Sequence, residues 1–65
     1  MADHVVAIEQ RSPYEFYQIE VFTNQLDALD YADQYARGHG YIQLSKRRWC
    51  SAEDDKQKLI VWKRR

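Results

Sequence analysis

The sequence predicts an α+β domain with the element order ββαββ, a two-layer sandwich in which one helix packs on one face of an antiparallel sheet. Three observations lead to this fold class. Hydrophobic side chains alternate with period two over residues 14–22, recur at helical spacing over 23–40, and alternate again over 41–50. A chain of 65 residues suffices for one small domain, so we expect a single domain over 1–65.

The first two strands form a predicted hairpin. Residues 4–10 are rich in β-branched side chains and residues 14–22 alternate, while Ser12-Pro13 between them favours a turn. Proline lacks the amide that a sheet ladder needs, which places the break there. Alternation predicts that one set of side chains faces the helix: Tyr17, Ile19 and Val21.

The helix is the element with the clearest signals. Asn24 is a suitable N-cap, and Arg37 can pair with Asp33 at i,i+4. Gly38 is expected to end the helix in the left-handed conformation, with Gly40 as a second flexible joint. The apolar stripe facing the sheet is predicted to contain Leu26, Leu29, Ala32 and Ala36.

Residues 41–50 are predicted to form one continuous third strand, and 58–65 a fourth. The helix-facing residues expected here are Ile42 and Leu44, with Val61 or Ile60. The opposite face would carry Tyr41, Gln43, Ser45, Arg47 and Trp49, while Lys46 and Arg48 extend the covered face beyond the helix.

One helix covers one side of a sheet, yet aromatic residues fall on both sides. Some of Phe16, Phe22, Tyr41 and Trp49 should therefore form a partly exposed aromatic surface, which is typical of interaction sites. Two alternatives remain: the side chains wrap round the sheet edge, or two copies pack face to face as a homodimer.

The formal net charge of zero conceals a division along the chain. Residues 1–45 carry seven acids and two bases, net −5, whereas residues 46–65 carry eight bases and three acids, net +5. Such asymmetry indicates either attraction within the fold or faces directed at different partners.

The residues available for chemistry do not indicate an enzyme. His4 and His39 lack partners at a recognisable spacing, and Cys50 is the single cysteine, which excludes an intrachain disulfide and a zinc site built on cysteines. Asp27, Asp30 and Asp33 fit a solvated helix face better than a metal site. We expect no cofactor and no metal. Without a signal-peptide pattern or a membrane-length apolar run, we expect a cytoplasmic protein with no membrane contact.

Binding is the remaining class of function. Two segments, 46–49 and 62–65, place cations beside a tryptophan, and both would lie together if the last two strands pair. Arginine and aromatic side chains suit an acidic protein surface, but also single-stranded nucleic acid. The neutral total charge favours the protein partner. The candidate partner-binding residues are Arg47, Trp49, Arg48, Lys46, Tyr41, Glu9, Trp62 and Lys63.

The segment NQLDALDYADQYARGHGYIQL resembles the small early protein of T7-like phages that inhibits host RNA polymerase. The likeness rests on Asn24 as helix cap, Ala28-Leu29 and Ala32 on the helix, Gly40-Tyr41 opening the next strand, and Arg47. Glu9 falls at a comparable place. The resemblance implies that Glu9 and Arg47 contact the jaw of the polymerase and interfere with promoter engagement.

Taken together, these observations predict a small, non-enzymatic inhibitor or regulator that binds a larger host protein with an acidic surface, such as RNA polymerase. If the chain is phage-encoded, it would act in the host cell cytoplasm. The alternative is a nucleic-acid-binding module that uses the Lys/Arg/Trp-rich C-terminal hairpin.

Overall fold

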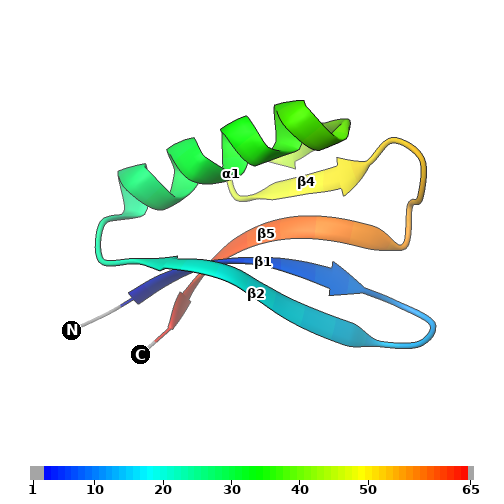
Figure 1. Cartoon of the computed structure of the whole chain (residues 1–65), viewed down its shortest axis with the longest axis horizontal. Helices are drawn as coiled ribbons and strands as arrows, with labels where there is room; N and C mark the ends of the chain where they lie inside the picture. The colour runs from blue at the N-terminus through cyan, green and yellow to red at the C-terminus, as the bar shows by residue number, and fades with distance from the viewer. Residues whose placement is uncertain (1–2, 65) are drawn as a thin grey trace.

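The computed structural model describes residues 3–64 and contains one helix packed on one face of a five-stranded antiparallel sheet (Figure 1). The α+β class and the helix-on-sheet arrangement predicted from the sequence are confirmed. The elements in chain order are β1 (Asp3–Gln10), β2 (Glu15–Phe22), α1 (Gln25–His39), β3 (Tyr41–Ser45), β4 (Arg48–Ser51) and β5 (Gln57–Arg64).

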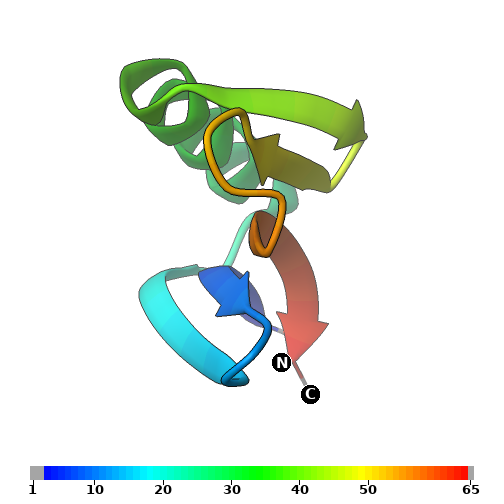
Figure 2. The ribbon, with the colours of Figure 1, turned by 90° about the vertical axis from the view of Figure 1, so that its right-hand side faces the viewer.

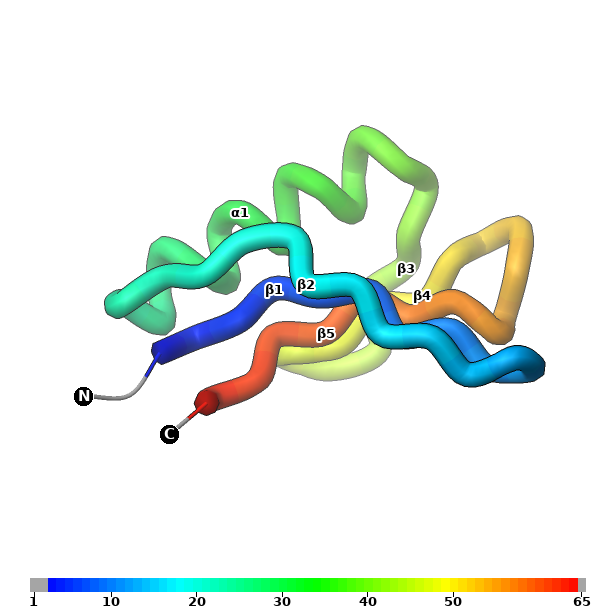
Figure 3. Tube along the Cα trace, turned by 60° about the horizontal axis from the view of Figure 1, so that its bottom comes forward, coloured from blue at the N-terminus to red at the C-terminus, as the bar shows by residue number. Residues whose placement is uncertain are grey.

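The strand order across the sheet is β2-β1-β5-β4-β3. The last strand of the chain therefore lies in the centre, where it joins the β1–β2 hairpin to the β3–β4 hairpin (Figure 2). Seen from another side, β1 runs between β2 and β5 while α1 lies along one side of the sheet (Figure 3). The outer edges of the sheet are β2 and β3.

The predicted third strand is wrong in its extent, because residues 41–50 form a hairpin instead of one strand. Ser45 pairs with Arg48 across a turn at Lys46-Arg47. A two-residue turn alone would reverse the alternation of side chains, but a bulge between Gln43 and Ser45 adds one residue and restores it. Alternation along 41–50 therefore matches that of a straight strand, and periodicity alone could not reveal the turn.

The two faces of this segment are interchanged relative to the prediction. Trp49 is 2% exposed in the core beneath α1 and Tyr41 packs against the same core, whereas Ile42 and Leu44 are 61% and 58% exposed on the other face. The helix supplies only small side chains to this contact, namely Ala28, Ala32 and Ala36. A large indole fills the space left by alanines better than an aliphatic side chain does, which explains the choice of Trp49.

A bulge also alters the prediction for β2. Gln18 pairs with Ala7 and Glu20 with Val6, so Ile19 is the extra residue and the alternation reverses beyond it. Ile19 packs against the core as expected, and Phe22 joins it there. Val21 instead pairs with Val5 on the uncovered face, and Tyr17 is 51% exposed.

The core beneath α1 draws on the remaining strands as well. Val6, Leu59 and Val61 are at most 4% exposed there. Of the two residues predicted for the last strand, Val61 therefore belongs to the core, while Ile60 points to the uncovered face. Aromatic rings continue this layer from β2 along the helix to β3, with centroid distances of 5.4 Å for Phe22–Tyr31, 6.5 Å for Tyr31–Tyr35 and 6.3 Å for Tyr35–Tyr41.

The helix has the predicted N-terminus but a later C-terminus. The Asn24 side chain accepts hydrogen bonds from the amides of Leu26 at 2.8 Å and Asp27 at 3.4 Å. The helix continues through Gly38, and Gly40 takes the left-handed conformation at φ 72°, so Gly40 is the C-cap. Leu26, expected in the apolar stripe, is 74% exposed in the first turn.

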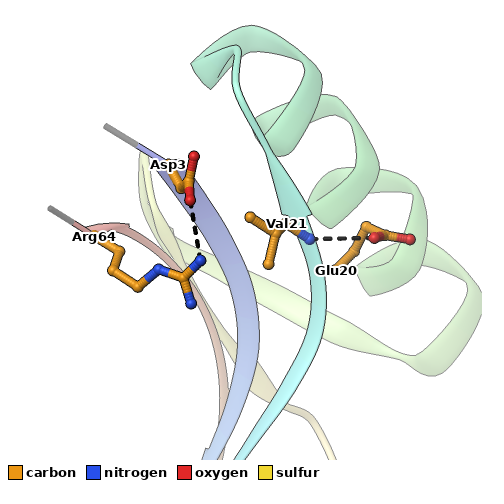
Figure 4. A network of polar contacts seen from close by, with 4 residues as sticks. All are labelled: Asp3, Glu20, Val21 and Arg64. Carbon is orange, nitrogen blue, oxygen red and sulfur yellow. Dashed lines mark hydrogen bonds and ion pairs between the residues drawn. The ribbon is translucent and has the colours of Figure 1, made fainter. Parts of the chain in front are cut away.

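Two ion pairs occur among residues 3–64. Arg37 pairs with Asp33 at 3.1 Å as predicted, and Arg64 pairs with Asp3 at 3.0 Å. The second pair joins the ends of β1 and β5, near the point where the Glu20 carboxylate accepts from the Val21 amide (Figure 4). One ion pair thus links the acidic and basic parts of the described chain. Most basic side chains of residues 46–64 therefore have no carboxylate partner within ion-pair distance in the described structure.

Replacing Trp49 by alanine should lower the free energy of unfolding by about 3–5 kcal/mol, because the change leaves a cavity under an alanine-lined helix. Urea denaturation followed by circular dichroism measures this loss. The control is Trp62→Ala, which removes the same side chain at a position 37% exposed and should cost about 1–2 kcal/mol. Equal losses in the two variants would contradict the assignment of Trp49 to the core.

Replacing Asn24 by alanine should lower the free energy of unfolding by about 1 kcal/mol, since two helix amides lose their acceptor. The urea midpoint measures the effect. Asn24→Asp keeps an acceptor oxygen in place and should retain most of the stability. If the aspartate variant were as unstable as the alanine variant, the side-chain cap would not be the cause.

Candidate functional site

The face of the sheet opposite α1, called here the open face, is not covered by the helix. Cross-strand register defines its residues. One row contains Phe16, Glu9, Lys58, Cys50 and Ile42, and the next contains Gln18, Ala7, Ile60 and Arg48. A third row contains Val21, Val5 and Trp62.

An aromatic pair crosses the middle of the open face. The rings of Phe16 and Trp62 meet edge to face at 6.0 Å, although they come from β2 and β5 with β1 between them. The diagonal that joins them crosses β1 at Ala7, whose small side chain leaves room for the contact. Ala7 and Val5 are 0% exposed, so this face buries a thin apolar layer of its own.

A pocket of about 330 Å³ opens beside this pair. Its residues come from three neighbouring strands and the turn after β1, and they are Glu9, Arg11, Arg48, Lys58, Ile60, Val61 and Trp62. Ile60 lies within this lining, where it pairs with the buried Ala7 on β1 and with Arg48 on β4. The next pair in one direction is Glu9 with Lys58, and in the other Val5 with Trp62.

Strand pairing and backbone hydrogen bonds fix the main-chain positions of the three basic residues that line the pocket. Arg48 lies directly opposite Ile60 on β4. The Arg11 amide donates to the Lys56 carbonyl at 3.1 Å, which extends the β1–β5 ladder into the turn and keeps Arg11 beside the start of β5. Lys58 pairs with Glu9 on β1 and with Cys50 on β4. The Cα atoms of all three basic residues are therefore fixed by the sheet, while their side chains can rotate.

The pocket carries an excess of positive charge. Arg11, Arg48 and Lys58 face it together with one carboxylate, that of Glu9. None of these three cations lies within 4.0 Å of a carboxylate oxygen in the described part of the chain, because both ion pairs there involve other residues. Glu9 instead accepts a hydrogen bond from the Tyr14 hydroxyl at 3.4 Å.

Of the residues predicted to bind a partner, the structure brings three together. Arg48, Trp62 and Glu9 line the same pocket. Lys46 is exposed in the β3–β4 turn, and Lys63 pairs with His4, in the row that belongs to the helix-covered face.

The other three predicted residues lie on the helix side of the sheet, which corrects their expected place on the open face. Trp49 is buried, and Tyr41 packs against the core. The Arg47 guanidinium faces the side-chain amide of Gln25, whose oxygen, when oriented toward it, accepts two hydrogen bonds at 2.7 and 3.1 Å. The bulge before the β3–β4 turn directs Arg47 toward the helix and Arg48 toward the open face.

Sequence reasoning missed Arg11, Lys58 and Ile60 as site residues. The signal for two of them was the alternation of Lys58, Ile60 and Trp62 in the last strand, which puts all three on one face. Arg11 follows the first strand by one residue, and only the long β1–β5 ladder shows that it meets the same face.

Within residues 3–64 no group of three or more histidine, cysteine, aspartate or glutamate side chains could hold a metal ion. His39 stacks on Tyr35 at a centroid distance of 4.0 Å, and the Cys50 thiol contacts the Ser51 carbonyl at 3.6 Å. The lining of the pocket offers charged groups and apolar contact to a ligand.

Comparison of the chain with protein-family models, with curated proteins and with solved structures finds no match. In the part of the chain that the structure describes, no helix has the length and apolar character needed to cross a membrane.

Tyr41 has a perturbed acidity. Burial raises the pKa of its phenol above the usual 10.0, with smaller contributions from Tyr35, Asp54 and Cys50. Its hydroxyl donates to the Gln57 side-chain oxygen at 3.4 Å, and the Gln57 amide donates to Gln10 at 3.2 Å, so Tyr41 connects the β3 edge to the central strands.

Stability should therefore fall at alkaline pH through Tyr41. Because the folded pKa lies above the unfolded one, this contribution is fully present below pH 10 and is lost as the pH rises through the folded pKa. Urea midpoints compared between neutral pH and about pH 11 measure the loss. Tyr41→Phe cannot ionise and should lose less stability over this range; an identical loss in both proteins would contradict the assignment.

Proposed function

We propose that this chain is a non-enzymatic binding module whose open face docks on an acidic surface of a larger protein. One observation carries the proposal: a single sheet face combines exposed apolar side chains with cations that have no internal ion-pair partner in residues 3–64. A centre of aromatic and arginine residues with a polar surround is the usual composition of a protein interface.

The apolar rim supports a protein partner over nucleic acid. Ile42 and Leu44 are 61% and 58% exposed at the β3 edge, and aliphatic side chains gain from packing on another protein surface more than from contact with phosphates. Edge-on contact between Phe16 and Trp62 also restricts the free ring faces on which bases would stack. The second tryptophan of the nucleic-acid alternative, Trp49, is buried.

The resemblance to the T7-type inhibitor extends the proposal to a phage-encoded regulator that acts on host RNA polymerase in the host cytoplasm. Of the two contacts it implies, Glu9 lies on the open face, where a partner can reach it. Arg47 faces Gln25 on the helix side and would bind the partner only from the edge of the molecule. We therefore place the main contact on Arg48 and the β3 edge.

The test is capture of a partner from a nuclease-treated bacterial lysate, followed by titration of the purified partner. The wild-type chain should recover a stoichiometric protein after nuclease treatment. Ile42→Glu puts a carboxylate on the exposed apolar rim and should weaken the affinity at least tenfold, because the acid is buried against an acidic surface.

The matched control is Leu26→Glu, which makes the same chemical change at a side chain 74% exposed on α1, away from the open face. Its affinity should stay within about twofold of wild type. Loss of the partner on nuclease treatment would favour the nucleic-acid alternative and contradict the proposal. Equal weakening by both variants would move the interface off the open face. A third outcome is a homodimer formed through this face. Light scattering on the free chain detects it as a doubled molar mass.

A further inference from the structure

The pocket on the open face has the charge and shape of a receptor for acidic side chains. We infer that it receives carboxylates of an acidic peptide segment on the partner, bound by Arg11, Arg48 and Lys58 against the ring of Trp62. This inference rests on the proposed function and names the chemistry by which the partner is recognised.

The size of the pocket suits side chains more than a large cofactor. Its volume of about 330 Å³ lies at the lower end of the range for ligand pockets. Ile60 forms an apolar floor beside Val61, and Trp62 forms a wall that its contact with Phe16 holds in place. The methylene groups of a glutamate side chain would pack on this floor and wall while its carboxylate reaches the cations.

More than one carboxylate is needed to neutralise the charge of the pocket lining. Three cations and Glu9 give the lining a formal charge of +2, so a segment with two acidic residues neutralises it. Two of the three cations are arginines, whose planar guanidinium groups bind carboxylates through paired hydrogen bonds. Repulsion among cations that converge without an internal partner is relieved when such a segment binds.

The ladder positions of these residues make the site preformed. Arg48 lies directly opposite Ile60 on β4, Lys58 precedes Ile60 by two residues on β5, and the Arg11 amide donates a hydrogen bond to the Lys56 carbonyl. Their Cα atoms need not move on binding, so only side-chain freedom is lost.

The two tryptophans provide an internal control for the experiment. Trp62 lines the pocket, whereas Trp49 lies on the other face of the sheet in the core. A ligand in the pocket should change the NMR signal of the Trp62 indole N–H and leave that of Trp49 unchanged. A general change of fold would move both signals.

The experiment titrates the full ¹⁵N-labelled chain at about 0.1 M salt with a blocked peptide of six glutamates. Saturable movement of the Trp62 signal is expected, with none for the matching peptide of six glutamines. Arg48→Gln combined with Lys58→Gln should weaken binding at least tenfold. The control, Lys46→Gln combined with Lys63→Gln, removes the same charge outside the pocket and should weaken binding less than threefold, since exposed distant charges are screened.

Three results would overturn the inference: no saturable shift of Trp62, equal weakening by the two double variants, or tighter binding of inorganic phosphate or of a single-stranded oligonucleotide at the same residues. The two proposals can fail separately. If Arg48→Gln with Lys58→Gln still captures the protein partner at wild-type affinity, the partner docks on the open face without the pocket. If the glutamate peptide binds but no protein partner is recovered, the acidic-peptide site stands and the proposed function does not.

Discussion

The packing of Trp49 against the alanine face of α1 is the contact on which the rest of this structure depends. Ala28, Ala32 and Ala36 are at most 1% exposed and contribute little volume, so the core needs one large side chain from the sheet. Trp49 supplies it, and its position fixes the orientation of β4. Once its indole faces the helix, alternation turns Arg48 and Cys50 to the open face. The same core contact thereby places one cation of the pocket.

Two irregularities in the strands decide which side chains the open face displays. The bulge in β2 turns Phe22 to the core and Val21 outward, while the bulge in β3 allows Ile42 and Trp49 to lie on opposite faces of one hairpin. Phe16 and Trp62 meet across β1 at the level of Ala7, and the pocket opens beside Trp62. The pocket is a consequence of strand geometry, because bulges re-aim side chains without breaking the sheet.

Local signals predicted the fold class, the N-terminal hairpin, the Asn24 cap and the Asp33–Arg37 pair, since each depends on residues close together in the chain. The faces of the sheet could not be predicted in this way. Ile42 and Leu44 alternate as aliphatic core residues ordinarily do, so the sequence predicted them beneath the helix. The small side chains of the alanine-lined helix explain why Trp49 and Tyr41 occupy that face instead. The site was predicted in part: Glu9, Arg48 and Trp62 share the pocket, but Arg11 and Lys58 join it through the β1–β5 ladder between the two ends of the chain.

The charge distribution gives the strongest physical reason to regard the open face as functional. The basic excess of residues 46–65 was compatible with internal pairing against the acidic first part of the chain, yet Asp3–Arg64 is the one such ion pair within residues 3–64. A domain of this size has a small free energy of unfolding, and like charges that converge without partners reduce it further. Neutral side chains at Arg48 and Lys58 would relieve that repulsion, since neither group supports the core under α1. These cations lie on the sheet ladder beside Trp62, and they are the groups through which we propose that a negatively charged partner binds.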